Sequence, residues 1–545
     1  MAENKTLSCF RWLAMTVGIL ASACQASREA NTNVCRTPAE EDLAPHVEFD
    51  DPSLLGDGGN PGGKPGGPGG AADGGVATIL DGSLGGGPDG NVQGRIGPPH
   101  TGKFPNAFGT GADQVMPGGE VNALDDFADS HPMGTNGREC ETCHTNERLW
   151  STTPAVLQER FDTGMPHFSL SPTKYATNET AARNDDLEPI FRTVDGSNSP
   201  NADVSTPEAR KRAYSMVLSR AVIRIGLPVP DDADFELVSV DDPYHFATKS
   251  ELSLFRRIPL MSNLRFHTTL MWDGRETAPC ATLTTDLRQQ ASHAITGHAQ
   301  GSTPPTDAVD GIVQAELRIY AAQYIDNRAG QLDQGGARGG PNFLAQVPFY
   351  WGINSFEKTD PNGRPYSREV FNVFFAWRAL PPHSEMNEAR VQIASGEQLF
   401  NSKEFKVSRV SGFNDVLGRA EITATCGACH NAPNVGVNSE GHLMDIGVSG
   451  EAHRTTDLPL YTFREKATGA TLKTSDPGQA LISKNWTDMN RFKVPSLRHL
   501  ANRPPYFHDG SAASLEAVVD HHDQRFGIGL SLTEKAAFVA FLSAL

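Results

Sequence analysis

Residues 140–144 read CETCH, and residues 426–430 read CGACH. In both stretches two cysteines stand three positions apart and a histidine follows, which is the attachment signature of c-type haem. The two thiols bond to the vinyl groups of one porphyrin, and the adjacent imidazole becomes an axial ligand of its iron. We therefore expect two covalently bound haems. The residues that hold them are Cys140, Cys143 and His144 in the first half, and Cys426, Cys429 and His430 in the second.

Other uses of these cysteines explain less of the pattern. A disulfide within each C-x-x-C pair gives no reason for the repeated histidine. A zinc site needs two such pairs at closer range, or a pair of histidines. Cys35 and Cys280 can form a disulfide if the chain is exported to an oxidising compartment, and the sequence leaves that pairing open.

The first 24 residues have the pattern of a secretory signal peptide. Lys5 and Arg11 precede a short apolar run, and the small residues 21–23 form a cleavage site. Cys24 follows that site and is either the first residue of a secreted protein or a lipidated cysteine. We expect a periplasmic or cell-envelope protein, which is an outer-membrane lipoprotein if Cys24 is acylated. Any contact with a membrane then runs through that lipid anchor.

The rest of the chain divides by composition. Residues 25–125 are rich in glycine and proline, and we expect a disordered tether because they bury too little apolar surface to fold. Order is expected from residue 126. An amphipathic helix within 387–405 suggests a boundary near residue 385, so we expect haem domains at 126–385 and 386–545. The formal net charge of −18 excludes a nucleic-acid partner.

A second pattern is shared by the two halves. NLRFHTTLMWDGRE (263–276) and SLRHLANRPPYFHDGS (496–511) both contain Leu-Arg and then an aromatic residue beside Asp-Gly. Each leads into an expected helix, with Thr285 or Ser514 at its start. With the haem motifs, these stretches resemble the bacterial di-haem cytochrome c peroxidases and their relatives, including MauG. The resemblance covers most of residues 130–545. It implies a mainly α fold of two tandem cytochrome c-like domains with long loop insertions, and the length is similar to that of the di-haem rubber oxygenases.

The resemblance implies a second axial ligand for the C-terminal haem. The family takes it from the helix after PYFHDG (505–510), and the matching position is His522. We therefore expect His430 and His522 on this iron, with a lower reduction potential than a His/Met pair gives. The alternative is a surface histidine that binds no metal. The resemblance also implies that Arg498 and His508 contact the haem propionates.

The same position in the first half is Ala294, which cannot bind iron, so we expect an N-terminal haem that is open on one side. The family's distal glutamine and catalytic glutamate match Gln290 and Gln300, and an amide cannot take a proton from peroxide. His298 lies one helical turn after Ala294 and can act as acid and base, because imidazole titrates near neutral pH. Alternatively, His298 or His293 binds the iron and closes the site, or is structural.

Two further family features concern the region between the haems. Trp272 matches a tryptophan that lies there, and it is either an electron relay or a buried core side chain. The family's calcium is doubtful here, because the matching positions are Arg257 and Arg503, which would repel a cation.

Taken with the resemblance, these features imply an exported peroxidase-like oxidoreductase. Electrons enter at the C-terminal haem from a small cytochrome-type or cupredoxin-type donor, pass near Trp272, and reduce hydrogen peroxide or dioxygen at the N-terminal haem. One alternative is a MauG-like or rubber-oxygenase-like oxidation of an organic or protein substrate. The other is a two-haem electron carrier without enzymatic activity.

Overall fold

The computed structural model describes residues 103–117, 134–144, 150–164, 181, 187–192, 195–357 and 360–545. The expected signal peptide with Cys24 lies outside these residues, as do Cys35 and most of the expected tether. Cys280 is disulfide-bonded, and its partner is none of the described cysteines. No helix in the described segments is long and apolar enough to cross a membrane.

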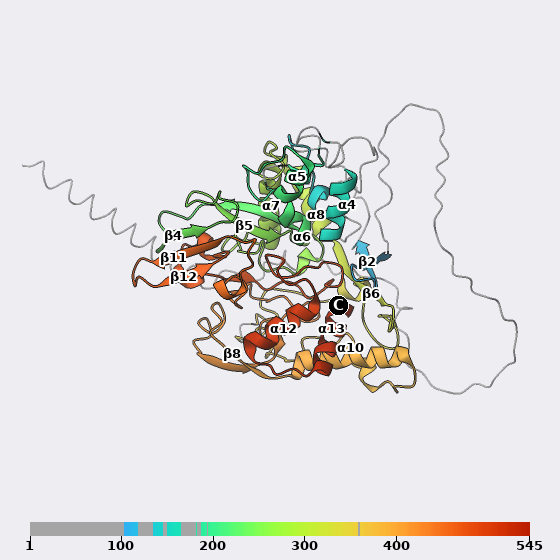
Figure 1. The fold of residues 1–545 in the computed structure, drawn as a ribbon. Coiled ribbons are helices and arrows are strands. Elements are labelled where there is room, and N and C mark those ends of the chain that lie inside the picture. The colour runs from blue at the N-terminus through green and yellow to red at the C-terminus, as the bar shows by residue number, and fades with distance from the viewer. Residues whose placement is uncertain are drawn as a thin grey trace, which may run out of the picture.

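The longer helices form two groups, one in the upper and one in the lower part of Figure 1. The first group contains α4 (Pro154–Thr163), α5 (Pro207–Ala213), α6 (Ser215–Arg220), α7 (Leu283–Thr296) and α8 (Thr306–Glu316). The second group contains α10 (Glu385–Ser402), α12 (Leu515–Phe526) and α13 (Leu532–Ala544). The four-residue helices are α3 (Cys140–Cys143), α9 (Pro341–Leu344) and α11 (Ala480–Ser483).

Side-chain caps set where these helices begin. The Ser514 side chain accepts a hydrogen bond from Ala517 N, so α12 starts where the sequence predicts. Helix α7 begins earlier than predicted, because Thr282 rather than Thr285 is its cap. In the second group, α10 and α13 cross in close contact: a Cβ on Gly396 would lie only 2.0 Å from the carbonyl oxygen of Ala537.

The expectation of a mainly α fold needs correction, because the described residues also form five antiparallel sheets. No strand was predicted from the sequence, because the recognised patterns were the haem motifs and the helices beside them. The largest sheet has the order β1-β2-β6-β7, with β1 (Lys103–Pro105), β2 (Gly111–Pro117), β6 (Ile319–Asp326) and β7 (Gly330–Gln331). A three-stranded sheet joins β12 (Thr471–Thr474), β11 (Leu460–Glu465) and β4 (Phe235–Asp241). The pairs are β3 (Val222–Leu227) with β5 (Leu252–Arg257), β8 (Phe405–Ser408) with β9 (Glu421–Ala424), and β10 (Leu443–Met444) with β13 (Phe492–Lys493).

Two expected boundaries change as a result. Residues 103–117, assigned to the tether, form β1 and β2 and pair with β6, so order begins before residue 126. Helix α10 begins at Glu385, yet the core around it also buries Phe371, Phe374 and Trp377. Strand β4 of the first half pairs with β11 of the second. The two halves are therefore interleaved, since apolar side chains before residue 385 complete the C-terminal core.

Candidate functional site

The second haem motif lies on the wall of a cavity of about 230 Å³. A short 3-10 helix after β9 presents Cys426 and Cys429 to this C-terminal cavity, and His430 follows. Helix α12 supplies another part of the wall through His522. None of the four motif cysteines is disulfide-bonded. The tertiary structure thus brings together the thiols and the two imidazoles that the sequence assigns to one haem.

His430 and His522 are each held with one ring nitrogen left for a metal. Nδ1 of His430 lies 2.6 Å from the carbonyl oxygen of Gly436, and Nδ1 of His522 lies 2.8 Å from that of Val518. Because a carbonyl oxygen only accepts hydrogen bonds, each Nδ1 carries a proton and each Nε2 keeps its lone pair. Burial lowers the pKa of both imidazoles to about 4, so both are neutral at pH 7, as metal ligation requires.

A second cavity, of about 170 Å³, lies beside the first haem motif. Cys140, Cys143 and His144 line this N-terminal cavity. Nδ1 of His144 lies 3.3 Å from the carbonyl oxygen of Trp150, and burial lowers the pKa of this imidazole to about 4. His144 therefore has the same arrangement as His430, with Nε2 left as a metal ligand.

Helix α7 forms a further part of the N-terminal wall. Ala294, the position that matches His522, lines the cavity together with Gln290. Alanine has no ligand atom, so this position cannot complete the coordination of an iron. Two other described histidines line the cavity, namely His267 and His298.

His298 belongs to a charged hydrogen-bonded group. Its Nδ1 lies 2.6 Å from Oδ2 of Asp195, whose other oxygen forms an ion pair with Arg138. Burial alone would raise the pKa of Asp195, but the hydrogen bond from His298 and the charge of Arg138 lower it to about 2. Asp195 is thus a carboxylate at neutral pH, and it accepts the Nδ1 proton of His298. Nε2 of His298 is then able to accept a proton.

Two candidates from the sequence lie outside this cavity. The Gln300 side chain is exposed, and its backbone oxygen accepts a hydrogen bond from Thr135. His293 is also exposed and pairs with Glu276 at 2.9 Å. The helix ends at Thr296, so the ten-residue spacing from Gln290 to Gln300 crosses a turn and does not return to the same face.

Trp272 lies between the two cavities and lines both of them. Its indole Nε1 donates a 2.9 Å hydrogen bond to the carbonyl oxygen of Arg257. Its own carbonyl oxygen accepts a 2.9 Å hydrogen bond from the backbone of Lys493. The indole is edge-on to the imidazole of His508, with 6.4 Å between ring centroids. The indole is therefore part of the wall that the two cavities share.

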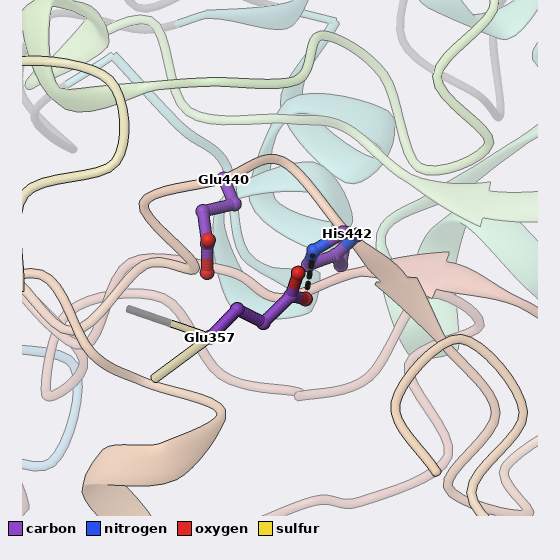
Figure 2. A group of neighbouring side chains, drawn as sticks. All are labelled: Glu357, Glu440 and His442. Carbon is purple, nitrogen blue, oxygen red and sulfur yellow. Dashed lines mark ion pairs between the residues drawn. The ribbon is translucent and has the colours of Figure 1, made fainter. Parts of the chain in front are cut away.

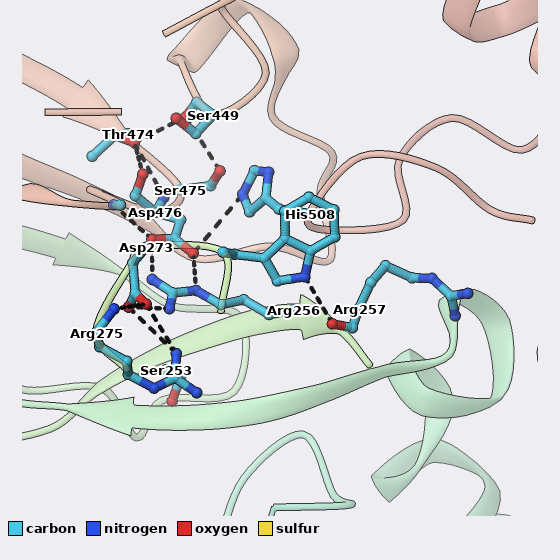
Figure 3. Close-up of polar contacts among 12 residues, drawn as sticks. Ser253, Arg256, Arg257, Asp273, Arg275, Ser449, Thr474, Ser475, Asp476 and His508 are labelled. Carbon is cyan, nitrogen blue, oxygen red and sulfur yellow. Dashed lines mark hydrogen bonds and ion pairs between the residues drawn. The ribbon is translucent and has the colours of Figure 1, made fainter. Parts of the chain in front are cut away.

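An ion-pair network beside this wall connects the two halves of the chain (Figure 3). Arg256, on β5, donates two hydrogen bonds to Asp476, of 2.7 and 2.9 Å, and one of 2.5 Å to Asp273. Arg275 also pairs with Asp273. Since Asp273 follows Trp272 directly in the chain, this network holds the MWDGRE segment against the second half.

Three basic side chains in the cavity walls bear on whether these cavities fit haem. Burial lowers the pKa of Arg257 to about 9, of Lys493 to about 7 and of Arg503 to about 10. Arg257 and Lys493 line both cavities, and Arg503 lines the C-terminal one. No carboxylate among the described residues pairs with any of them. Cations buried in this way need an anionic partner, and the propionates of haem supply one, so the residues present fit the group.

Of the two residues that the resemblance assigned to the haem propionates, His508 lines a cavity and Arg498 does not. His508 lines the C-terminal cavity and stacks on Phe492 with 3.9 Å between ring centroids. Arg498 is fully buried but is not one of the described residues that line either cavity. Its guanidinium has Asp113 as the nearby opposite charge.

Arg257 and Arg503, the positions that the resemblance matched to the family's calcium site, lie next to each other. Nη2 of Arg257 donates a 3.4 Å hydrogen bond to the carbonyl oxygen of Arg503, and the charge of Arg503 contributes to the lowered pKa of Arg257. A divalent cation would meet two guanidinium groups there.

A separate polar group connects the loop that follows the second haem motif to the loop that contains Glu357. Its members are Glu357, Glu440 and His442, whose ligand atoms all lie within 4.8 Å of one another. Nε2 of His442 is 2.7 Å from Oε1 of Glu357 (Figure 2). None of the three lines either haem cavity. The pair ties the loop that contains Glu357 to the loop after His430.

The structure also adds residues that the sequence analysis missed. No sequence motif pointed to Asp195 or Arg138. Glu316 lines the N-terminal cavity from the end of α8 and is 3% exposed. A signal for Glu316 was present, because it follows Ile312 by one turn on the buried face of an amphipathic helix.

Comparisons with known proteins complete the description of the site. No family model matches the chain. Cytochrome-c peroxidase IdrP2 of Denitromonas iodatirespirans is 28% identical over 306 residues, which cover 53% of this chain and 68% of the relative. The protein of the same name from Pseudomonas sp. (strain SCT) is 28% identical over 309 residues, or 54% and 69% of the two chains.

Two shorter or weaker similarities were found. Cytochrome c551 peroxidase of Nitrosomonas europaea is 33% identical over 121 residues, which cover 22% of this chain and 30% of the relative. Among solved structures, a MauG-like protein associated with microbial copper homeostasis is 16% identical over 55% of this chain and 76% of its own. The TM-score is 0.25, which is too low to compare the folds.

Proposed function

We propose that this chain, a member of the bacterial di-haem cytochrome c peroxidase and MauG superfamily, is an exported oxidoreductase that reduces hydrogen peroxide. The reaction takes two electrons and two protons and yields two water molecules from each peroxide. The similarity to cytochrome-c peroxidases and the two cavities beside the C-x-x-C-H motifs support this proposal.

Each cavity would hold one haem c. Cys140 and Cys143 would bond to the N-terminal haem, and Cys426 and Cys429 to the C-terminal one. A bound haem supplies an iron that exchanges single electrons and, where a coordination position is open, reacts with peroxide. Lys493 would neutralise propionate charge in the shared wall.

The observation that best supports this proposal is a difference in metal ligands between the two cavities. In the C-terminal cavity His430 and His522 both keep Nε2 for a metal, whereas in the N-terminal cavity the position that matches His522 is Ala294. This difference supports a closed electron-entry site in the second half and an open reaction site in the first.

The N-terminal cavity offers groups that can move a proton and orient peroxide. Asp195 holds the proton of His298 on Nδ1, so Nε2 of His298 accepts a proton from peroxide and returns it to the departing oxygen. Gln290 lines the same cavity and can donate an amide hydrogen bond to a peroxide oxygen. Arg138 keeps Asp195 ionised.

Electrons would reach this cavity from the C-terminal one. A small cytochrome-type or cupredoxin-type protein in the periplasm is the proposed donor. Trp272 lines both cavities, and its fixed indole is the proposed relay between them.

A second candidate function is favoured by one observation. His298 lines the N-terminal cavity, and if its Nε2 bound the iron both haems would be closed and the protein would be an electron carrier. The purified holoprotein distinguishes the two. A resting spectrum with one high-spin and one low-spin haem, and rapid spectral change on mixing with peroxide, supports the peroxidase. Two low-spin haems that do not react with peroxide support the carrier.

A further inference from the structure

Glu316 is a buried carboxyl group in the wall of the N-terminal cavity. It is the last residue of α8, is 3% exposed, and its Oε2 has no hydrogen-bond partner among the described residues. No described residue forms an ion pair with it. Ile312, one turn earlier on the same helix, also lines the cavity. The carboxyl is thus presented to the cavity from an apolar helix face.

Other buried glutamates in this protein are paired. Glu188 forms an ion pair with Arg160. Glu397 accepts a 2.7 Å hydrogen bond from Phe374 N and pairs with Arg378 at 3.2 Å. A carboxyl that serves packing alone gains nothing from being buried without a partner, because its desolvation is not offset. Glu188 and Glu397 therefore have an arginine partner that Glu316 lacks among the described residues.

The charged side chains on α7, the helix that packs against α8, have partners other than Glu316. Asp286 accepts a hydrogen bond from Ala278 N, Arg288 pairs with Asp310 of α8, and His293 pairs with Glu276. Burial alone raises the pKa of Glu316 to about 8, so it holds a proton at neutral pH. Besides the motif cysteines Cys140 and Cys143, the titratable side chains that share the cavity wall with it are Arg138, Glu139, His144, Asp195, Arg256, Arg257, His267, Arg275, His298 and Lys493.

We propose that Glu316 is a proton donor of the N-terminal cavity. This inference rests on the proposed function. During peroxide reduction the O–H bond of the carboxyl breaks, the proton goes to a product water, and the carboxylate regains a proton from solvent before the next turnover. The two electrons come from the protein donor, and solvent supplies the second proton. Together with the proton that His298 transfers within peroxide, this supplies an acid group that Gln300 cannot provide.

The test uses the full-length holoprotein and the isosteric variant Glu316→Gln. Infrared difference spectra of the wild type should show a protonated carboxyl band that disappears with a midpoint near pH 8 and is absent in Glu316→Gln. Stopped-flow mixing with peroxide should be about 100-fold slower in the variant at pH 7. Glu316→Asp should recover part of the rate. The matched control is Glu397→Gln, a buried glutamate that lines neither cavity, which should keep both the band and the rate.

Three results of these experiments would overturn a proposal, and they separate the role of Glu316 from the peroxidase activity. A wild type that reacts with peroxide while Glu316→Gln reacts equally fast, with the same pH profile, overturns the role of Glu316 and leaves the peroxidase proposal standing. A wild type without the titrating band overturns it even if the variant does not fold. A wild type that does not react with peroxide overturns the peroxidase proposal, and the inference with it.

Discussion

The indole nitrogen of Trp272 donates a 2.9 Å hydrogen bond to the carbonyl oxygen of Arg257, and both residues line both haem cavities. Arg257 is the last residue of β5, and its guanidinium reaches the carbonyl oxygens of Thr152 and Ala221 at 3.0 and 2.9 Å. The ring of Trp272 is therefore fixed to a buried strand and not only packed in a core.

Replacing Trp272 by Phe should slow electron transfer between the haems several-fold, because the ring between the cavities becomes smaller and loses its anchor. The lost hydrogen bond should cost about 1 kcal/mol of unfolding free energy. Reduction of the N-terminal haem after rapid reduction of the C-terminal one measures the rate. Trp377→Phe is the control. Trp377 is fully buried, donates the same kind of 2.9 Å bond to Gln334, and lines neither cavity. Equal rates in both variants would contradict a relay.

Replacing His298 by Gln should slow the reaction with peroxide by about 10²- to 10⁴-fold, because the proton acceptor is lost. Stopped-flow absorption at several peroxide concentrations measures this rate. The control is His293→Gln, a histidine on α7 that pairs with Glu276 outside the cavity. It should react at the wild-type rate. If His298→Gln instead turns a low-spin haem high-spin and speeds the reaction, His298 is an iron ligand.

Asp195 should contribute to stability in a defined pH range. Its pKa in the folded protein is lowered from 3.8 to about 2, so the contribution is complete above pH 3.8 and is lost as the pH falls towards 2. The shift corresponds to roughly 2 kcal/mol. Urea unfolding of the wild type and Asp195→Asn between pH 2 and pH 6 measures it. The difference between the two proteins should shrink as the pH falls, and a difference independent of pH would argue against the ion pair.

Replacing His522 by Ala should convert one low-spin haem to high-spin, because its Nε2 is the second ligand offered to the C-terminal iron. Absorption and electron paramagnetic resonance spectra of the oxidised protein report this change. The neighbouring His521 is the control, since it contacts the carbonyl oxygen of Ile446 at 3.0 Å and does not line the cavity. His521→Ala should keep the wild-type spectrum. An unchanged spectrum in His522→Ala would refute the ligand assignment.

Much of the site could be predicted from short sequence patterns, because haem attachment and helix caps depend on neighbouring residues. The resemblance assigned the family's ligand position after PYFHDG (505–510) to His522, and the structure has His522 on α12 in the cavity wall with His430. The matching position in the first half, Ala294, lines the other cavity. Predictions failed where the chain left regular structure. Gln300 was expected in the distal pocket, but α7 ends at Thr296 and Gln300 is exposed.

The sequence by itself determined the local chemistry: two haem attachment motifs, the capped helices beside them, and a histidine in one half where the other has alanine. Only the tertiary structure decided which distant side chains share a cavity. It brought Asp195 to His298, Lys493 to the wall beside Trp272, and Glu316 to a buried position where no described residue hydrogen-bonds its Oε2. The physical reason is that burial and the pairing of charges depend on contacts between segments far apart in the chain, which no local pattern records.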